Sequence, residues 1–178
     1  MSKIIVLNGS PRKNGNTEKL VNAFVKGAQS AGHHVKVFSV TDTKVNACTG
    51  CDYCVKNDGE CVQKDEMQDI YQALYDGDAV VFASPSYYYA WTAQLKAIVD
   101  RFYVSDTKSF QLSASAMLVP LAGNPETDAA IAVKHYEIIS NQYQWEDKGV
   151  ILVGNVAGKD DIVGNPALLE AEKLGAKM

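Results

Sequence analysis

Four cysteines lie close together in the spacing C-x2-C-x2-C-x6-C: Cys48, Cys51, Cys54 and Cys61. In a cytosolic chain, which we expect here, such a group indicates thiols, a metal or a cluster rather than disulfides. Three thiolates at x2 spacing suit one face of a 4Fe–4S cluster, although Val62 follows the fourth cysteine where bacterial ferredoxins have proline. Two other interpretations stay open. One is a zinc site, which usually takes two well-separated cysteine pairs. The other is reduced thiols that are partly buried or redox-active, since free cysteine usually packs as a small apolar side chain.

The loop Asn8–Thr17 is rich in hydrogen-bond donors and leads directly into a segment of helical periodicity. Unpaired backbone N–H groups at a helix start, together with the helix dipole, favour an anion there. We expect the loop to bind phosphate through Ser10, Arg12, Asn14, Asn16 and Thr17. The patterns G-x-x-x-x-G-K-[ST] and G-x-G-x-x-G are absent, which leaves a monophosphate as the expected ligand. The alternative is a plain polar connection, but such connections usually run only about 2–6 residues.

A second loop, Ser84–Thr92, holds four large aromatic side chains: Tyr87, Tyr88, Tyr89 and Trp91. Aromatic rings stack on flat heteroaromatic ligands, and their polar tips still form hydrogen bonds. Tyrosine and tryptophan are also enriched where subunits meet. We therefore expect some of these rings to face a ligand and others to face a partner chain.

Short apolar runs alternate with helical segments, which indicates a parallel sheet covered on both faces. The expected strands are Ile4–Leu7, Val35–Val40, Ala79–Ala83, Ala114–Leu121 and Gly149–Val153. A helix is expected from about Glu126 to Tyr143, with Ile131, His135, Ile138 and Ile139 on one side. Five strands favour the order 2-1-3-4-5 over 3-2-1-4-5-6.

The sequence thus predicts a three-layer, flavodoxin-like α/β fold with a five-stranded parallel sheet of order 2-1-3-4-5. It forms a single domain over residues 1–178 with a cysteine-rich loop at 45–63. In such a sheet a ligand binds beyond the carboxyl ends of the strands, where the strand order reverses. The loops that follow the first and third strands line that crevice.

The composition excludes several classes of protein. The chain has 178 residues, of which 47% are hydrophobic, so a full core can form. Lysine and arginine number 17 and aspartate and glutamate 21, giving a net charge of −4 that disfavours nucleic acid as a partner. No apolar stretch approaches the roughly 20 residues of a membrane span, and the run Ile4–Leu7 is too short for a signal peptide. We expect a cytoplasmic protein that binds no membrane.

The two loops, together with the segments Leu95–Arg101 and Trp145–Gly149, resemble the flavodoxin-fold NAD(P)H-dependent FMN reductases and quinone reductases. The resemblance covers nearly the whole chain. It implies bound FMN, NADH or NADPH as co-substrate, and a homodimer or homotetramer. It assigns the phosphate to the first loop and the flavin ring to Pro85, Ser86, Tyr87, Tyr88 and Gly123. The cysteine spacing resembles that of iron–sulfur flavoproteins, a branch of the family with a 4Fe–4S cluster near FMN.

The chemistry implied by this resemblance is hydride transfer to the flavin, for which the protein supplies position and hydrogen bonds. We therefore expect no catalytic acid or base, and we expect Asp100-Arg101 to be a structural pair. The first functional hypothesis is an FMN-dependent NAD(P)H oxidoreductase that reduces a quinone, flavin, azo or nitro acceptor. The alternatives are an iron–sulfur flavoprotein electron carrier and a binding module that has lost redox activity.

Overall fold

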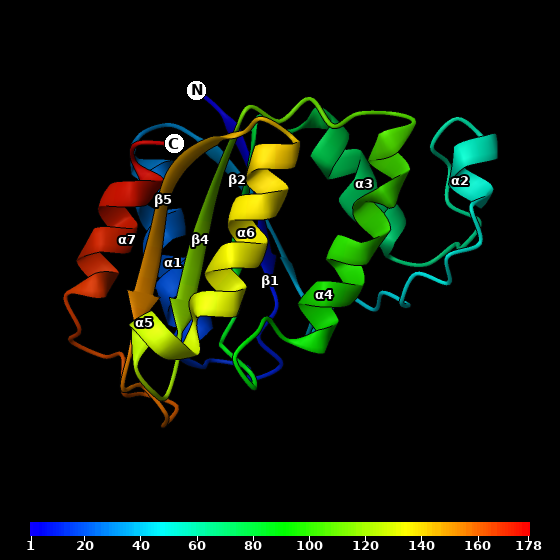
Figure 1. Ribbon diagram of the computed structural model, residues 1–178. Helices are drawn as coiled ribbons and strands as arrows, with labels where there is room; N and C mark the ends of the chain where they lie inside the picture. Colours follow the sequence, from blue (N-terminus) through cyan, green and yellow to red (C-terminus); the bar gives the residue numbers. More distant parts are fainter.

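The computed structural model describes residues 1–178, with one five-stranded sheet between two layers of helices (Figure 1). The strands are β1 (Lys3–Asn8), β2 (His34–Ser39), β3 (Ala79–Ala83), β4 (Ala114–Pro120) and β5 (Glu146–Val153). All neighbouring strands are parallel, and their order is β2-β1-β3-β4-β5. The predicted fold class and strand order are confirmed.

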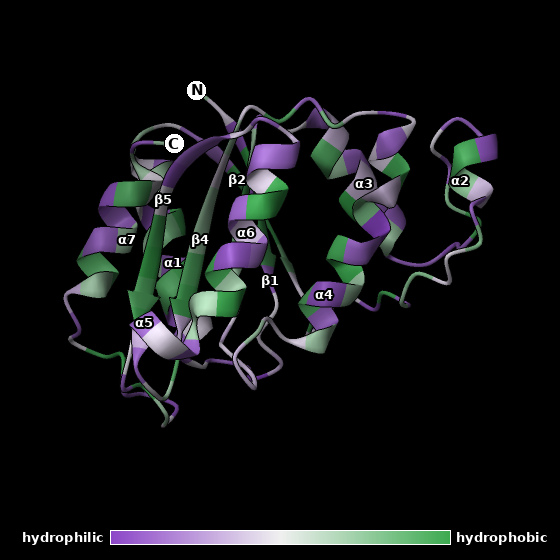
Figure 2. Cartoon of the chain, in the orientation of Figure 1, coloured by the Kyte–Doolittle hydropathy of each residue, from purple (hydrophilic) through white to green (hydrophobic).

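The helices cover both faces of this sheet. They are α1 (Asn16–Ser30), α2 (Tyr53–Lys56), α3 (Met67–Asp76), α4 (Ala93–Asp100), the 3-10 helix η1 (Arg101–Asp106), α5 (Pro125–Asp128), α6 (Ala130–Gln142) and α7 (Ala167–Gly175). Helices α1 and α7 pack on one face, and α3, α4 and α6 pack on the other. Every residue of β3 and β4 is buried, as expected for central strands of a parallel sheet. Figure 2 shows the apolar strands inside and the polar helix faces outside.

Helices α1 and α7 approach each other backbone to backbone. A Cβ atom on Gly27 would lie 1.8 Å from the carbonyl oxygen of Glu172, and one on Gly175 would lie 2.1 Å from that of Phe24. Only glycine fits at either position without moving a helix. Helix α7 therefore helps to fix the position of α1, whose first residues, Asn16 and Thr17, belong to the predicted phosphate loop.

The helix predicted from Glu126 to Tyr143 is wrong as a single element, because it divides into α5 and α6 at Ala129. The Ser86 hydroxyl donates to the carbonyl oxygen of Asp128 at 2.7 Å. A continuous helix would give that carbonyl oxygen to a backbone N–H four residues on. The side chain of Ser86 thus takes the place of one helical hydrogen bond at the break.

The predicted apolar side of this helix is wrong for Ile131 and Ile138 but right for Ile139, which is buried. Ile131 and Ile138 are 60% and 57% exposed, whereas Tyr136 and Ser140 are buried. Ser115 of β4 forms hydrogen bonds with Tyr136 at 3.0 Å and with Ser140 at 2.9 Å. A polar network inside the core, which hydrophobic periodicity does not detect, sets the face that α6 buries.

Two further differences concern the ends of elements. Strand β5 begins at Glu146 rather than Gly149, and the cysteine-rich loop contains the short helix α2. No helix in the structure is both long enough and apolar enough to cross a bilayer.

Candidate functional site

The two predicted ligand loops meet at the carboxyl ends of β1 and β3, where the strand order reverses. The N–H of Gly9 donates to the carbonyl oxygen of Ala83 at 2.7 Å. The hydroxyl of Thr92 donates to the carbonyl oxygen of Gly9 at 2.7 Å and accepts the N–H of Leu95 at 3.3 Å. Thr92 thus caps α4 and binds the second loop to the first.

A cavity opens between these loops. It is lined by Ser10, Arg12, Gly15, Asn16, Thr17, Pro85, Tyr87, Pro120, Val156 and Lys159. Six of the residues predicted to bind the cofactor are therefore brought together in one place. The sequence reasoning missed the contribution of the segment after β5, which supplies Val156 and Lys159.

The first turn of α1 presents free donors at this cavity. Gly15 is the N-cap residue, and no side chain caps the helix. The N–H groups of Asn16, Thr17 and Glu18 donate to no acceptor in the protein. Because Ser10 and Thr17 are themselves buried, the donors are concentrated in a small volume. Such a helix start is suited to an anion.

Two cations stand beside these donors. Arg12 is exposed, and its guanidinium reaches the carbonyl oxygen of Ala157 at 3.3 Å. Lys159 lines the same cavity and its amino group forms no ion pair. Nothing in the sequence around Lys159 indicated this position, because only the fold brings the loop after β5 next to the loop after β1.

The side chains of Asn14 and Asn16, two of the predicted phosphate ligands, lie in surroundings that differ from those expected. The side-chain amide of Asn16 donates to the carbonyl oxygens of Val156 at 3.0 Å and Gly158 at 2.7 Å. Its side chain therefore holds the loop after β5, and its backbone N–H is the group left for a ligand. Asn14 lines a separate hollow with Glu18, which accepts its N–H at 2.6 Å.

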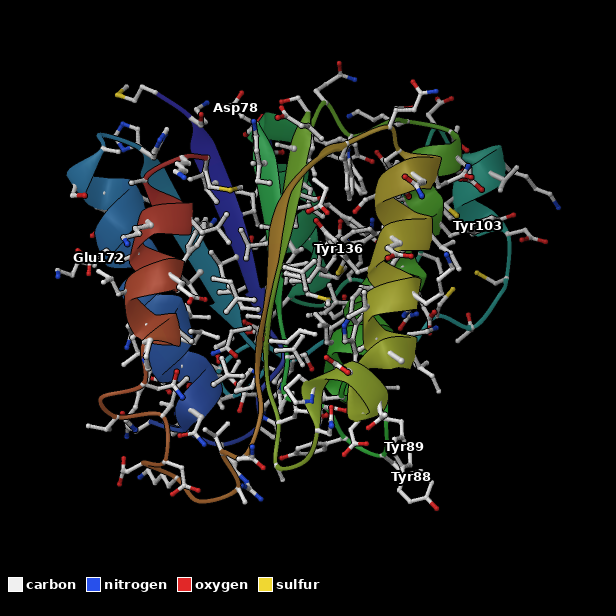
Figure 3. All side chains as sticks on the ribbon, turned by 60° about the vertical axis from the view of Figure 1, so that its left-hand side comes forward. Asp78, Tyr88, Tyr89, Tyr103, Tyr136 and Glu172 are labelled. Atoms are coloured by element: carbon white, nitrogen blue, oxygen red, sulfur yellow. The ribbon has the colours of Figure 1, made fainter.

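The tyrosine loop makes a tight turn. Tyr87 and Ala90 exchange backbone hydrogen bonds of 2.8 and 3.2 Å. Tyr88 and Tyr89, which lie between these two residues, have positive φ angles of 49° and 75°. Bulky residues rarely adopt such angles. Both rings point outward at the edge of the molecule (Figure 3), and Tyr88 is 96% exposed.

The other predicted ring-side residues line a hollow next to this turn. Ser86, Tyr88 and Gly123 border it, and its volume is about 240 Å³. Trp91, in contrast, is buried and stacks on Phe82 with ring centroids 5.2 Å apart. The aromatic loop therefore divides into core and surface residues.

The cysteine-rich segment stands at the side of the molecule away from α7 (Figure 1). All four cysteines are free thiols and line one cavity, which Tyr103 and Arg101 also border. Burial raises the pKa of Cys54, whereas the Tyr53 N–H and the Thr49 hydroxyl lower that of Cys51. The surroundings of these two thiols thus shift their pKa values in opposite directions.

Four thiols that border one cavity fit an iron–sulfur cluster in number and chemistry. The structure gathers no three ligand side chains closely enough to hold a single metal ion.

Asp100 and Arg101 each form an ion pair, but not with each other. Asp100 pairs with Lys96 one turn earlier on α4, at the surface. Arg101, which lines the cysteine cavity, is buried and pairs with Asp65 at 2.6 Å. The side chains of consecutive residues in a helix point in different directions. Two residues that are adjacent in the sequence are therefore poorly placed to pair with each other.

Comparison with known proteins agrees with the fold and identifies the family. A family model described as NADPH-dependent FMN reductase matches residues 2–158. The chain therefore belongs to the NADPH-dependent FMN reductase family, and it is an oxidoreductase. It is 33% identical over 182 residues to an iron–sulfur flavoprotein of Archaeoglobus fulgidus, a match that covers 99% of this chain and 78% of that protein.

Solved structures share the fold at low identity. An NAD(P)H:quinone oxidoreductase from Methanothermobacter marburgensis superposes with a TM-score of 0.77 at 14% identity, over 99% of this chain and 96% of that chain. An FMN-dependent NADH-azoreductase from Bacillus anthracis, solved in complex with FMN, gives a TM-score of 0.75 at 14% identity and 98% coverage of both chains. The homodimer or homotetramer expected from the sequence stays a prediction.

Proposed function

We propose that the chain binds FMN across the loops 8–17 and 84–92 and uses it to carry hydride from NADH or NADPH to a quinone, flavin, azo or nitro acceptor. The observation that supports this most is the first turn of α1. The free N–H groups of Asn16, Thr17 and Glu18 occur where Ser10, Arg12 and Lys159 border one cavity. A phosphate dianion at that point would satisfy donors that the protein leaves without partners.

Each side chain then has a defined task. Ser10, Thr17 and the N–H groups of α1 would hold the phosphate, with Arg12 and Lys159 balancing its charge. Pro85 and Tyr87 would border the flavin on the second loop. The bound flavin supplies the hydride acceptor, N5. The hollow beside Ser86, Tyr88 and Gly123 would admit the second substrate.

Paired titrations with FMN and riboflavin test the phosphate assignment. Arg12→Ala should weaken FMN binding about 10- to 100-fold, the effect of one charge-assisted hydrogen bond, and leave riboflavin binding unchanged. Lys13→Ala is the matched control, because Lys13 carries the same charge but pairs with Asp42 at the surface. Equal losses in both variants, or equal affinity for FMN and riboflavin, would refute the assignment.

Steady-state oxidation of NADH and NADPH with a quinone tests the reaction. Rapid oxidation that depends on both FMN and the quinone supports the proposal. A purified protein that stays colourless and takes up no added FMN would instead indicate the binding module.

A second candidate is an electron carrier that holds a 4Fe–4S cluster at Cys48, Cys51, Cys54 and Cys61. The four free thiols bordering one cavity favour it, as does the similarity to the iron–sulfur flavoprotein of Archaeoglobus fulgidus. Anaerobic reconstitution with iron and sulfide, followed by iron analysis, distinguishes the candidates. About four irons per chain supports the cluster, and a persistent lack of iron rejects it.

A further inference from the structure

The wall of the cysteine cavity contains a buried cation. Arg101 begins η1, its side chain is 1% exposed, and it borders the same cavity as the four cysteines. A buried arginine is costly unless its charge and its N–H groups are satisfied. The partners of this guanidinium therefore indicate what the cavity is built for.

The guanidinium binds a carboxylate through one terminal nitrogen and weaker acceptors through the other. One terminal nitrogen of Arg101 donates to both carboxylate oxygens of Asp65, at 2.7 and 2.6 Å. The other terminal nitrogen donates to the sulfur of Cys61 at 3.3 Å and to the carbonyl oxygen of Gln63 at 3.4 Å. The Nε atom is buried and has no partner. The guanidinium thus donates to the sulfur of Cys61 and keeps one further buried N–H, at Nε, without an acceptor.

Asp65 fixes the loop as well as the arginine. It accepts the N–H of Asn46 at 2.8 Å, so one carboxylate connects the two ends of the cysteine segment. Gln63 also donates to the carbonyl oxygen of Ala47, at 3.0 Å. These contacts hold the ends of the segment together beside Arg101, and they place Cys61 against the guanidinium.

A second element holds Arg101 from the opposite side. The ring of Tyr71 on α3 lies 5.7 Å from the guanidinium carbon, and its hydroxyl donates to the carbonyl oxygen of Arg101 at 3.0 Å. Of the four cysteine sulfurs, only that of Cys61 accepts a hydrogen bond from a charged side chain. Cys48 accepts only the N–H of Gly50, at 3.5 Å.

We propose that Arg101 is the positioning residue of the cysteine site: it fixes Cys61 as a ligand and stabilises added negative charge at its sulfur. The proposal rests on the cluster proposed above. One-electron reduction by a chemical reductant adds one negative charge to an iron–sulfur cluster and breaks no bond. Hydrogen bonds to the sulfur ligands and nearby positive charge favour the reduced form, so Arg101 raises the reduction potential.

Two variants separate this role from a purely structural one. Arg101→Lys keeps the positive charge and can pair with Asp65, but it lacks the planar fork that reaches two partners at once. Arg101→Gln combined with Asp65→Asn removes both charges, so no unpaired ion is left in the protein interior. Lys56→Gln is the matched control, because it removes one exposed charge near the cysteines without touching a sulfur.

The experiment is a potentiometric titration of the reconstituted proteins, followed by EPR, with iron content measured first. We expect the double variant to load iron and to lose about tenfold in the equilibrium constant for reduction, which is about 59 mV for one electron, because it loses the hydrogen bond to Cys61 while the net charge stays the same. Arg101→Lys should lie between the double variant and the wild type, and Lys56→Gln should match the wild type.

The outcomes separate the two proposals. A wild type that binds no iron overturns the cluster, and with it the role of Arg101. A loaded wild type whose potential and EPR spectrum are shared by both Arg101 variants overturns the role of Arg101 alone. Should the double variant fail to fold, the potential of Arg101→Lys against that of Lys56→Gln decides the question.

Discussion

Replacing Thr92 by valine should uncouple the two ligand loops. Thr92 is fully buried, and its hydroxyl makes two hydrogen bonds, one to the carbonyl oxygen of Gly9 and one from the N–H of Leu95. Valine has nearly the same shape but can make neither. The backbone N–H of Thr92, which donates to the hydroxyl of Ser84 at 3.2 Å, is kept in the variant.

The magnitude follows from these two bonds. Loss of the cap on α4 costs about 1 kcal/mol. Gly9 is buried and its carbonyl oxygen accepts no other hydrogen bond, so leaving it unpaired costs about 1–3 kcal/mol more. We expect Thr92→Val to lower the free energy of unfolding by about 2–4 kcal/mol, a large part of the roughly 5–15 kcal/mol that holds an average domain together.

Urea unfolding of the flavin-free protein measures this loss, and Thr92→Ser is the control. Serine keeps both hydrogen bonds and removes only one methyl group, for which we expect a loss of about 1 kcal/mol. The valine variant should also bind FMN more weakly than the serine variant, because the loop that carries Ser10 is no longer tied to the second loop. A valine variant as stable as the serine variant would show that this hydroxyl does not connect the loops.

Three further predictions concern stability. Gly27→Ala should lower the unfolding free energy by about 3 kcal/mol despite alanine's better helix propensity, because the new methyl would overlap the Glu172 carbonyl; urea unfolding measures it. Tyr88→Gly should raise it by about 1 kcal/mol by removing a side chain from positive φ; unchanged stability would contradict this. Burial tends to raise the pKa of Asp65, but the hydrogen bonds from Arg101 and from the backbone of Asn46 and Met67, together with the charge of Arg101, lower it below its ordinary value. That stabilisation is complete above about pH 4 and is lost as the pH falls through the lower folded pKa, a loss that Asp65→Asn should abolish in melting curves.

Local patterns predicted most of the framework. The strand β3 begins and ends at the predicted residues, because an apolar run between a turn and a polar loop allows few other boundaries. The first loop could be recognised since its donors are consecutive in the sequence. In both cases the information is local.

The failures share a physical cause. The buried face of α6 depends on Ser115 meeting Tyr136, and Arg101 finds Asp65 rather than its neighbour Asp100. These contacts join residues far apart in the sequence, and only the folded chain brings them together. Lys159 was missed for the same reason, since it reaches the phosphate loop from the other end of the chain.

The contact between α1 and α7 has a consequence for how the protein is made. A ribosome produces the loop 8–17 before it produces Gly175 and its neighbours, on which the helix behind the loop rests. The side-chain amide of Asn16 likewise has no acceptors until Val156 and Gly158 have been synthesised. A nascent chain halted before α7 therefore contains all the hydrogen-bond donors of the proposed phosphate site. It lacks the packing of α7 against α1 that holds those donors in position.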